Sequence, residues 1–405
     1  MALASQQQVL WPTTPPSTDL LFSVIIPAKD EAENLPATLA ALAAQTDLAG
    51  RRLLPSCFEI LVLANNCSDQ TAAVVRRFKR QHPTLALHVV EVQLPPAEAH
   101  VGRARRMLMD EACRRLEATA GSTGIIASTD ADTRVAPTWL AATGQEIANG
   151  AAAVGGRIFP ERAVRSDCSV RRTHLRDAAY RLARTQLEAL LDPTPTDPWP
   201  RHHQHYGASL ALTVAAYRQV GGLPVVPFLE DEALWQALHR HDLPLRHSPA
   251  VQVTTSARHA GRVAVGLSWQ LREWAAMSRQ QREPLVERGT ALAVEWTARR
   301  KLRQLWEQAR HQPTRQALPS CVRLAAVLSV PAGSLAAQIV EAPTFGLLWQ
   351  WVQKHRAVWR RSRVVTLPQA LTELRQLIAQ HQGTALLPSP MAADALLVTE
   401  GSAAG

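Results

Sequence analysis

The chain has 405 residues, an apolar fraction of 46% and a formal net charge of +10. This length exceeds one usual domain, so we expect either one large domain with an appendage or two domains. The apolar fraction allows a large core. The positive charge comes almost wholly from arginine and favours anionic partners, but no nucleic-acid-binding signature accompanies it, so we expect no nucleic acid.

Cysteine usage and the termini indicate the compartment. The five cysteines are scattered without Cys-x-x-Cys spacing, which argues against a disulfide framework or a zinc site and favours a reducing cytoplasm. Residues 1–20 lack the basic start and apolar run of a signal peptide and are predicted to be a disordered lead-in. The apolar stretch 324–340 is broken by Pro331 and Gly333, so we expect no membrane span and a soluble protein.

From residue 22 the chain alternates short apolar runs with helix-like segments. We expect strands at 22–28, 59–65, 86–92 and 124–129, and helices at 35–44, 71–81 and 102–118. This alternation predicts an α/β domain in which right-handed crossovers join parallel strands and helices cover both faces. Ligands then bind beyond the carboxyl ends of the strands. Polar clusters fall at three of those ends, at residues 27–31, 65–66 and 130–132.

Beyond residue 155 the pattern changes. Residues 161–205 are rich in Arg and His, with a Pro-rich break at 192–200, and their cluster His202-His203-x-His205 is interpreted as part of a lid-like segment rather than a metal site. A helix that begins with acids is expected at 229–241 and a last strand with its loop at 245–262. The chain from 265 to 382 is mostly helical in pattern, and the tail after 383 is Ala/Pro/Ser-rich.

Asp130 and Asp132 stand one residue apart after an apolar strand. Alternate strand residues point to one side, so both carboxylates can aim at a common point. Two like charges held close need a cation between them, and the alternatives are a divalent metal or a turn with solvated carboxylates. A phosphatase that uses the first Asp as nucleophile is excluded, because no lysine occurs between Lys79 and Lys301 to assist it.

Four motifs in order carry a family resemblance: SVIIPAKDEAENLPATLAAL, ILVLANNCSDQT, VGRARR and STDADT. Together they resemble family 2 glycosyltransferases with the GT-A fold, over roughly residues 20–262. The resemblance implies a GT-A (Rossmann-like) mixed sheet flanked by helices at 21–262. A mostly helical C-terminal region at 263–382 and a flexible tail at 383–405 follow from the sequence pattern.

The resemblance also implies a donor, a nucleotide-diphosphate sugar such as a UDP- or GDP-sugar, and roles for individual residues. The nucleoside would be held by Pro27, Ala28, Asp30, Glu31 and Asn65, although Asn65-Asn66 stands where many members carry Asp-Asp. Mg²⁺ or Mn²⁺ held by carboxylates can neutralise the departing diphosphate. We expect Asp132 as the direct metal ligand, Asp130 beside it in the donor site, and His259 as a further ligand.

Three residues at the start of the third helix are further donor-site candidates. Arg103 and Arg106 could reach phosphate, and Gly102 would let the backbone approach it. The alternative is a solvated helix face.

The acceptor side is expected at Glu230-Asp231. Asp231 is the expected general base for a hydroxyl acceptor, and Glu230 would orient it; the alternative is helix capping by Glu230, Asp231 and Glu232. Gly207, Ala208 and Ser209 would line the acceptor side or, alternatively, form a tightly packed strand start. The acids favour an inverting glycosyltransferase over a retaining one or a non-catalytic nucleotide-sugar-binding module. A nucleotidyltransferase would need a glycine-rich first loop, which PAKDEAEN is not.

A basic, Trp-containing segment at 349–363 predicts an amphipathic helix. Packing on the catalytic domain is favoured for it over peripheral contact with an anionic membrane, which would lie at the inner face. The sequence leaves the oligomeric state and the acceptor open.

Overall fold

The structure is a computed structural model that describes residues 11–161, 168–256, 267–311, 318–356 and 363–382. Most of the expected lead-in, the tail after 382 and His259 lie outside these residues.

A mixed eight-stranded sheet forms the N-terminal part, in the order β3-β2-β1-β4-β7-β6-β8-β5. The strands are β1 (Phe22–Ala28), β2 (Phe58–Asn65), β3 (Ala86–Val92), β4 (Ile125–Ser128), β5 (Thr133–Val135), β6 (Ala153–Pro160), β7 (Leu210–Thr213) and β8 (Leu245–Thr255). The first four expected strands are confirmed and pair in parallel. β7 runs antiparallel to both β4 and β6, and β8 is parallel to β6.

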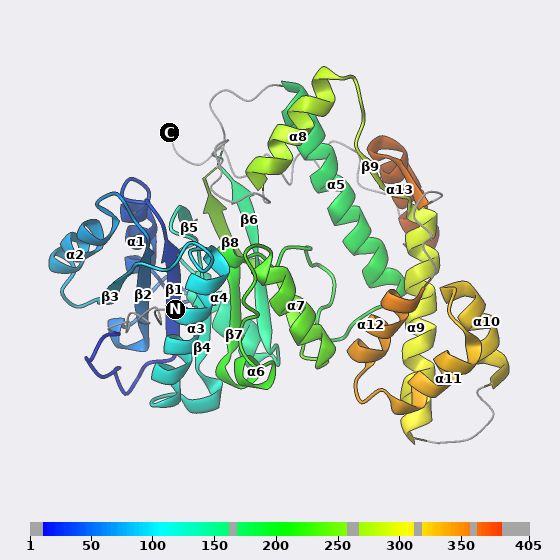
Figure 1. Ribbon diagram of the computed structural model, residues 1–405, viewed down its shortest axis with the longest axis horizontal. Helices are drawn as coiled ribbons and strands as arrows, with labels where there is room; N and C mark the ends of the chain where they lie inside the picture. Colours follow the sequence, from blue (N-terminus) through cyan, green and yellow to red (C-terminus); the bar gives the residue numbers. More distant parts are fainter. Residues whose placement is uncertain (1–10, 162–167, 257–266, 312–317, 357–362, 383–405) are drawn as a thin grey trace, which may run out of the picture.

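Helices cover both faces of this sheet (Figure 1). They are α1 (Leu35–Ala43), α2 (Thr71–Gln81), α3 (Val101–Glu117), α4 (Trp139–Ala148), α6 (Val214–Gln219) and α7 (Glu230–Arg240). Side chains of α1, α2 and α4 form one core with the sheet, and side chains of α3, α6 and α7 form the core on the other face. The central strands β2 and β4 are buried along their whole length because both faces are covered.

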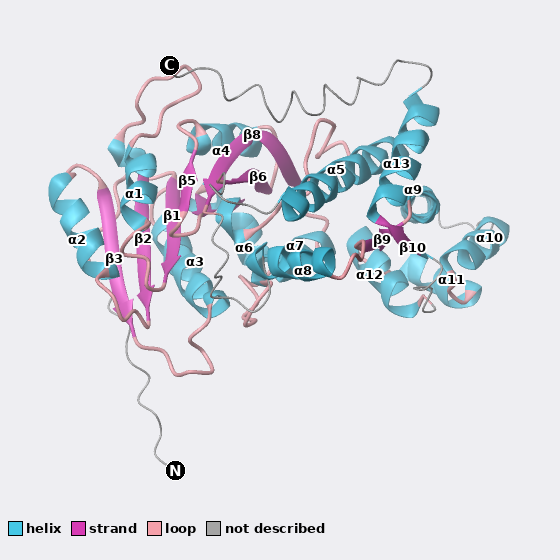
Figure 2. Cartoon of the chain, turned by 90° about the horizontal axis from the view of Figure 1, so that it is seen from above, coloured by secondary structure: helices cyan, strands magenta, loops and turns pink. Residues whose placement is uncertain are grey.

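The C-terminal part is helical, as expected from its pattern. It contains α8 (Leu267–Arg279), α9 (Gly289–His311), α10 (Leu318–Leu328), α11 (Ala332–Glu341), α12 (Phe345–His355) and α13 (Leu367–Gln382), with a small antiparallel pair, β9 (Leu285–Glu287) and β10 (Val364–Thr366). The long helix α5 (Cys168–Leu191) was not predicted, and it packs with α9 and α13 (Figure 2).

The helical part contacts the sheet part at the end of α7. Asp242, which follows α7, accepts the backbone N–H groups of Phe345 and Gly346 at 2.7 Å each. Because the first N–H groups of a helix have no partner within it, this carboxylate caps α12. Trp349 of α12 is buried, and Arg356 bonds Glu295 of α9. These contacts agree with the packing expectation for this segment.

No single helix among the described residues has the length and apolar composition to cross a membrane. The segments Cys321–Leu328 and Ala332–Glu341 meet that requirement only as a pair, with a bend of 107° between them.

A buried ion pair joins the carboxyl end of α3 to β2. The Arg115 guanidinium donates to Glu59 of β2 at 2.7–3.0 Å, and the two side chains are 2% and 1% exposed. Ser23 also donates to the Glu59 carboxylate. Burial and the nearby charge of Arg115 also lower the pKa of His88 to about 4.

Arg115→Met is expected to destabilise the fold by about 3–5 kcal/mol, because it leaves the Glu59 carboxylate buried without its cation. Urea unfolding followed by circular dichroism measures this change. Arg76→Met is the matched control, since Arg76 and its partner Glu91 are both exposed. An equal effect of both substitutions would show that the Glu59 pair contributes nothing special.

Candidate active site

The expected site residues meet at one edge of the sheet because of strand direction. β1, β2 and β4 are parallel, so their carboxyl ends lie at this edge. β7 is antiparallel to β4, so its start lies at the same edge, with Leu210 opposite Ser128. The Ser128 hydroxyl donates to the carbonyl of Gly207 at 3.0 Å. Segments separated by about 80 residues are therefore joined next to Asp130.

The loop after β1 is fixed to the loop after β2. Asp30 has a left-handed backbone (φ 50°), and its carboxylate accepts the Ser68 amide and hydroxyl at 2.6 and 3.0 Å. The hydrogen bond from the Ser68 backbone N–H is the main cause of the lowered pKa of Asp30. Glu31 is buried and accepts the side-chain amide of Asn34. The structure thus brings Pro27, Ala28, Asp30 and Glu31 together at the end of β1.

Asn65, the last residue of β2, is buried, and its side-chain oxygen has no hydrogen-bond partner among the described residues. A buried amide oxygen without a donor is costly. A nucleoside base at this edge would supply such a donor.

Potential metal-ligand atoms of Asp30, Cys67 and Asp69 lie within 4.8 Å of one another. The carboxylates already accept other donors, since Asp69 binds the Ala32 amide and Thr71. Burial raises the pKa of the Cys67 thiol, which disfavours the thiolate that metals bind. This cluster therefore holds the two loops together.

Arg105 of α3 joins the donor-side and acceptor-side acids. Its guanidinium donates to Asp130 at 2.7 Å and is also ion-paired with Glu230, the first residue of α7. Arg105 and Glu230 are 3% and 5% exposed. A cation shared by two acids in a poorly solvated place fixes both carboxylates relative to each other.

Gly207 is required by this arrangement. A Cβ at this position would clash with the Arg105 guanidinium, which lies flat against the glycine backbone. The absent side chain thus leaves the space that Arg105 occupies between Asp130 and Glu230.

The carboxylates of Asp130, Asp132 and Asp231 lie close enough at this edge of the sheet to interact electrostatically. Burial raises the pKa of Asp130 to about 6, the charges of Asp132 and Asp231 add to the rise, and Arg105 opposes it. The Asp130 side chain is still 38% exposed, so it lies at the bottom of an accessible site. An oxygen-rich, acidic set of this kind fits Mg²⁺ or Mn²⁺. Among the described residues, neither Asp130 nor Asp132 belongs to a group of three His, Cys, Asp or Glu side chains within ligand distance, and the predicted ligand His259 lies outside the described part.

The acid triplet at the start of α7 divides into paired and unpaired members. Glu230 pairs with Arg105, and Glu232 contacts the His205 ring at 3.1 Å. Asp231 instead accepts backbone amides, from Gly207 at 2.9 Å and from Glu232 at 2.8 Å. Within the described part of the chain, Asp231 has no cationic partner in contact, which leaves it the acid best placed to accept a proton.

Two predicted donor-site residues contact the segment before α7. Arg106 donates to the carbonyls of Gly221 and Leu223 and to Asp110, and Gly102 lies directly under the Val226 carbonyl. Both therefore help to hold that segment in place, and their donor-site role stays a prediction. Arg103 pairs with Glu98 at 3.1 Å and remains partly exposed near the helix start.

The three residues predicted to line the acceptor side have different surroundings. Gly207 binds Asp231 through its amide, as described above. Ala208 is buried, and the buried Ser209 hydroxyl accepts the indole N–H of Trp139 at 3.0 Å. Ser209 thus belongs to the core, which is the packing alternative considered for this segment.

Sequence reasoning missed Arg105, although a signal existed. Arg105 lies at helical spacing from the buried Leu108, Met109 and Ala112, so it falls on the apolar face of α3. Arg103 and Arg106 are off that face.

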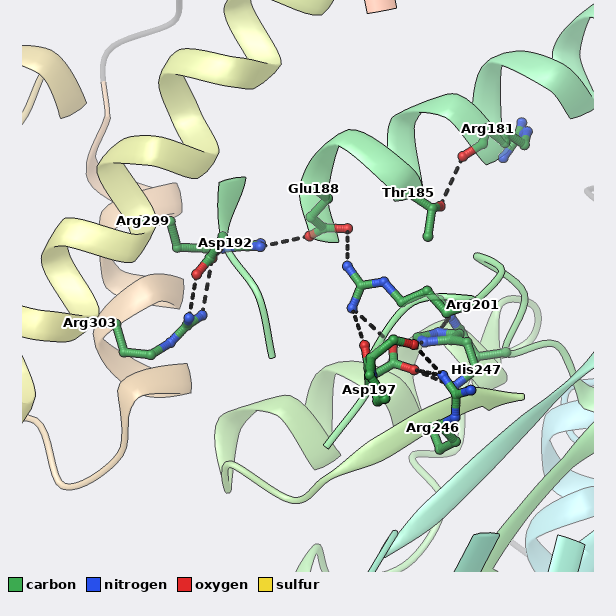
Figure 3. A network of polar contacts seen from close by, with 12 residues as sticks. Arg181, Thr185, Glu188, Asp192, Asp197, Arg201, Arg246, His247, Arg299 and Arg303 are labelled. Carbon is green, nitrogen blue, oxygen red and sulfur yellow. Dashed lines mark hydrogen bonds and ion pairs between the residues drawn. The ribbon is translucent and has the colours of Figure 1, made fainter. Parts of the chain in front are cut away.

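A second missed set centres on Asp197 (Figure 3). This carboxylate accepts the His247 ring at 2.8 Å and also binds Arg246 and Arg201. Arg201 contacts Glu188 of α5, which pairs with Arg299 of α9. The sequence shows these residues only as a basic, Pro-rich stretch, because their partners lie on three distant elements.

The mixed sheet and the acids at this edge agree with the glycosyltransferase of the GT-A type that the four motifs resemble. Residues 23–200 match the family model described as "Glycosyl transferase family 2". This part of the chain is therefore a family 2 glycosyltransferase domain, which confirms the resemblance seen in the motifs. No curated protein matches the chain significantly.

Three solved structures have a weak likeness to this chain. The mannosyltransferase PcManGT from Pyrobaculum calidifontis, solved with GDP-Man and Mn²⁺, is 16% identical with a TM-score of 0.41, covering 94% of this chain and 92% of that one. TarS 1–349 from S. aureus, with UDP-GlcNAc, is 14% identical with a TM-score of 0.41, covering 90% and 92%. GalNAc-T7, with UDP, GalNAc and Mn²⁺, is 14% identical with a TM-score of 0.40, covering 70% and 51%.

Gly207→Ala is expected to displace Arg105 and to lower glycosyl turnover at least about tenfold, with a stability cost of about 1–3 kcal/mol from overpacking. Turnover is measured well below the melting temperature, so that the protein stays folded. The control is Gly333→Ala on α11, where an added Cβ meets nothing within 4 Å. Normal turnover of Gly207→Ala would show that the position of Arg105 does not matter.

Proposed function

We propose that this chain transfers a sugar from a nucleotide-diphosphate sugar to a hydroxyl acceptor with inversion, and that Asp231 is the general base. The observation that carries the proposal is the Arg105 bridge, which places the donor-side Asp130 and the first turn of α7 at one site. A donor and an acceptor must meet within about 3–3.5 Å, and this bridge fixes the two sides in register.

The nucleoside would lie against the end of β1 and the side chain of Asn65. The buried Asn65 oxygen without a partner supports a base that donates a hydrogen bond there. Both uracil and guanine carry such donors, which is compatible with the proposed UDP- or GDP-sugar.

The chemical step follows from the acid that remains free of a cation. Asp231 takes the proton of the acceptor hydroxyl, whose oxygen forms a bond to the anomeric carbon while the bond from that carbon to the diphosphate breaks. The amides of Gly207 and Glu232 orient the Asp231 carboxylate. Glu230 is held by Arg105 and therefore orients the site rather than accepting the proton. Attack from the side opposite the diphosphate inverts the anomeric centre.

We propose Asp132 and Asp130 as the residues that hold Mg²⁺ or Mn²⁺, with His259 as a further ligand. The like charges of Asp132 and Asp231 close to Asp130 support a cation at this place. When bound, the metal would offset the charge that develops on the diphosphate. The cytoplasmic location and contact of the basic segment 349–363 with the inner face of an anionic membrane stay predictions.

A retaining mechanism is the second candidate within this fold. NMR of the anomeric configuration of the first product separates the two, since an inverting enzyme gives the opposite configuration to that of the donor.

UDP or GDP is expected to bind tightly only with divalent metal, and Asp132→Ala should remove most of this dependence. Isothermal calorimetry with Mn²⁺, with Mg²⁺ and with EDTA measures it. Asp231→Ala is the matched comparison, since it removes a carboxylate from the same site and should leave nucleotide affinity nearly unchanged. Equal affinity with metal and with EDTA in the wild-type protein would contradict the metal role.

A further inference from the structure

A chain of four titratable side chains leads from the first turn of α7 into the protein. Glu232 contacts His205 Nε2 at 3.1 Å, His205 Nδ1 lies 3.4 Å from His247 Nε2, and His247 Nδ1 lies 2.8 Å from Asp197. His205 is 12% and His247 14% exposed, so solvent does not replace these contacts. The Glu232 end lies one residue from Asp231.

The direction of each hydrogen bond follows from the buried end. Asp197 is a carboxylate, because hydrogen bonds from His247 and the nearby Arg201 charge bring its pKa down to about 2 despite burial. His247 Nδ1 therefore donates to Asp197. The contact between His205 Nδ1 and His247 Nε2 needs one proton between the two nitrogens. Burial lowers the pKa of His247, which favours His205 Nδ1 as the donor of this bond.

This leaves His205 Nε2 facing the Glu232 carboxylate, whose pKa is lowered chiefly by that same contact. Two bare acceptors 3.1 Å apart would repel, so Nε2 also carries a proton. The His205 ring then holds protons on both nitrogens and is a cation. It stacks on Trp235 with ring centroids 5.2 Å apart, an arrangement that suits a cation over an indole.

The position of this cation explains why Asp231 differs from the two acids beside it. Glu230 is neutralised by Arg105 from one side, and Glu232 is neutralised by His205 from the other. We propose that His205, braced by His247 and Asp197, is a positioning residue that holds and neutralises Glu232, so that the proton affinity of Asp231 is not raised by a second free carboxylate. The proposal rests on the proposed function of Asp231.

The brace continues into the helical part of the molecule. Asp197 binds Arg201 and Arg246, Arg201 contacts Glu188 of α5, and Glu188 pairs with Arg299 of α9 (Figure 3). His202, next to the chain, is held separately, since its Nε2 meets the Ser248 carbonyl. The segment that carries His205 is thus fixed from α5, α9 and β8.

The charged groups around Asp231 and His205 define the expected pH dependence of turnover. Asp231 is faced by Asp130 after β4, by the phenol of Tyr206 and by its neighbours on α7. His205 is faced by His247 on β8, by Glu232 on α7 and, through space, by His203. When the His205 charge is removed, the Glu232 carboxylate becomes an unbalanced negative charge near Asp231, which then holds its proton to higher pH.

His205→Gln is therefore expected to move the acid limb of the pH profile of donor turnover upward by about half a pH unit or more. Turnover of UDP- or GDP-sugars with water as acceptor gives this profile without a known acceptor. The double variant His205→Gln, Glu232→Gln should return the limb to its wild-type position, because both charges are gone. A His205→Gln profile that is lowered at every pH without a shift would overturn the proposal, since loss of structure alone gives that result.

A second measurement needs no activity. ¹⁵N NMR of histidine-labelled protein at pH 7 should show one ring with both nitrogens protonated, whose signals vanish in His205→Gln and change to a neutral ring in Glu232→Gln. His241→Gln is the control, because His241 lies at the other end of α7, where its ring contacts the Ala237 carbonyl. A neutral His205 ring in the wild-type protein would overturn the proposal even if sugar transfer is demonstrated, and a charged ring would stand even if the base is another residue.

Discussion

The geometry of the candidate active site depends on one buried guanidinium, that of Arg105. Arg105 is 3% exposed and sits between Asp130, at the end of β4, and Glu230, at the start of α7. Without this cation two carboxylates would face each other in a poorly solvated place, which is costly. The glycine at position 207 and the antiparallel course of β7 both serve this contact, because they leave room for the guanidinium at the edge of the sheet.

The consequence is a rigid placement of α7. Its first turn is held by Arg105 and His205, and the residue after its last turn, Asp242, caps α12 of the helical part. The Asp197 network ties the segment before Gly207 to α5 and α9 (Figure 3). The helical part therefore helps to hold the first turn of α7 in place through the Asp197 network.

The sequence predicted the first four strands, their helices and the meeting of Asp30, Asn65 and Asp130 at one edge, because alternation and strand direction are local signals. It did not predict α5, whose arginine-rich surface hides the apolar face that packs on α13. It favoured Arg103 and Arg106 over Arg105, although only Arg105 shares the apolar face of α3. The partners of His205 and Asp197 come from β8, α7 and α5, and such long-range pairings leave no pattern in one sequence.

The most direct test of the account is the rate of sugar transfer, or of donor hydrolysis, by Asp231→Asn. Asparagine keeps the size of Asp231 and can accept one of its two backbone N–H groups, but it cannot accept a proton, and such assistance is worth roughly 10²- to 10⁴-fold. The account predicts a rate loss of at least about 100-fold with donor affinity unchanged. A near-normal rate would contradict it and would transfer the role of base to Glu232 or indicate a retaining mechanism.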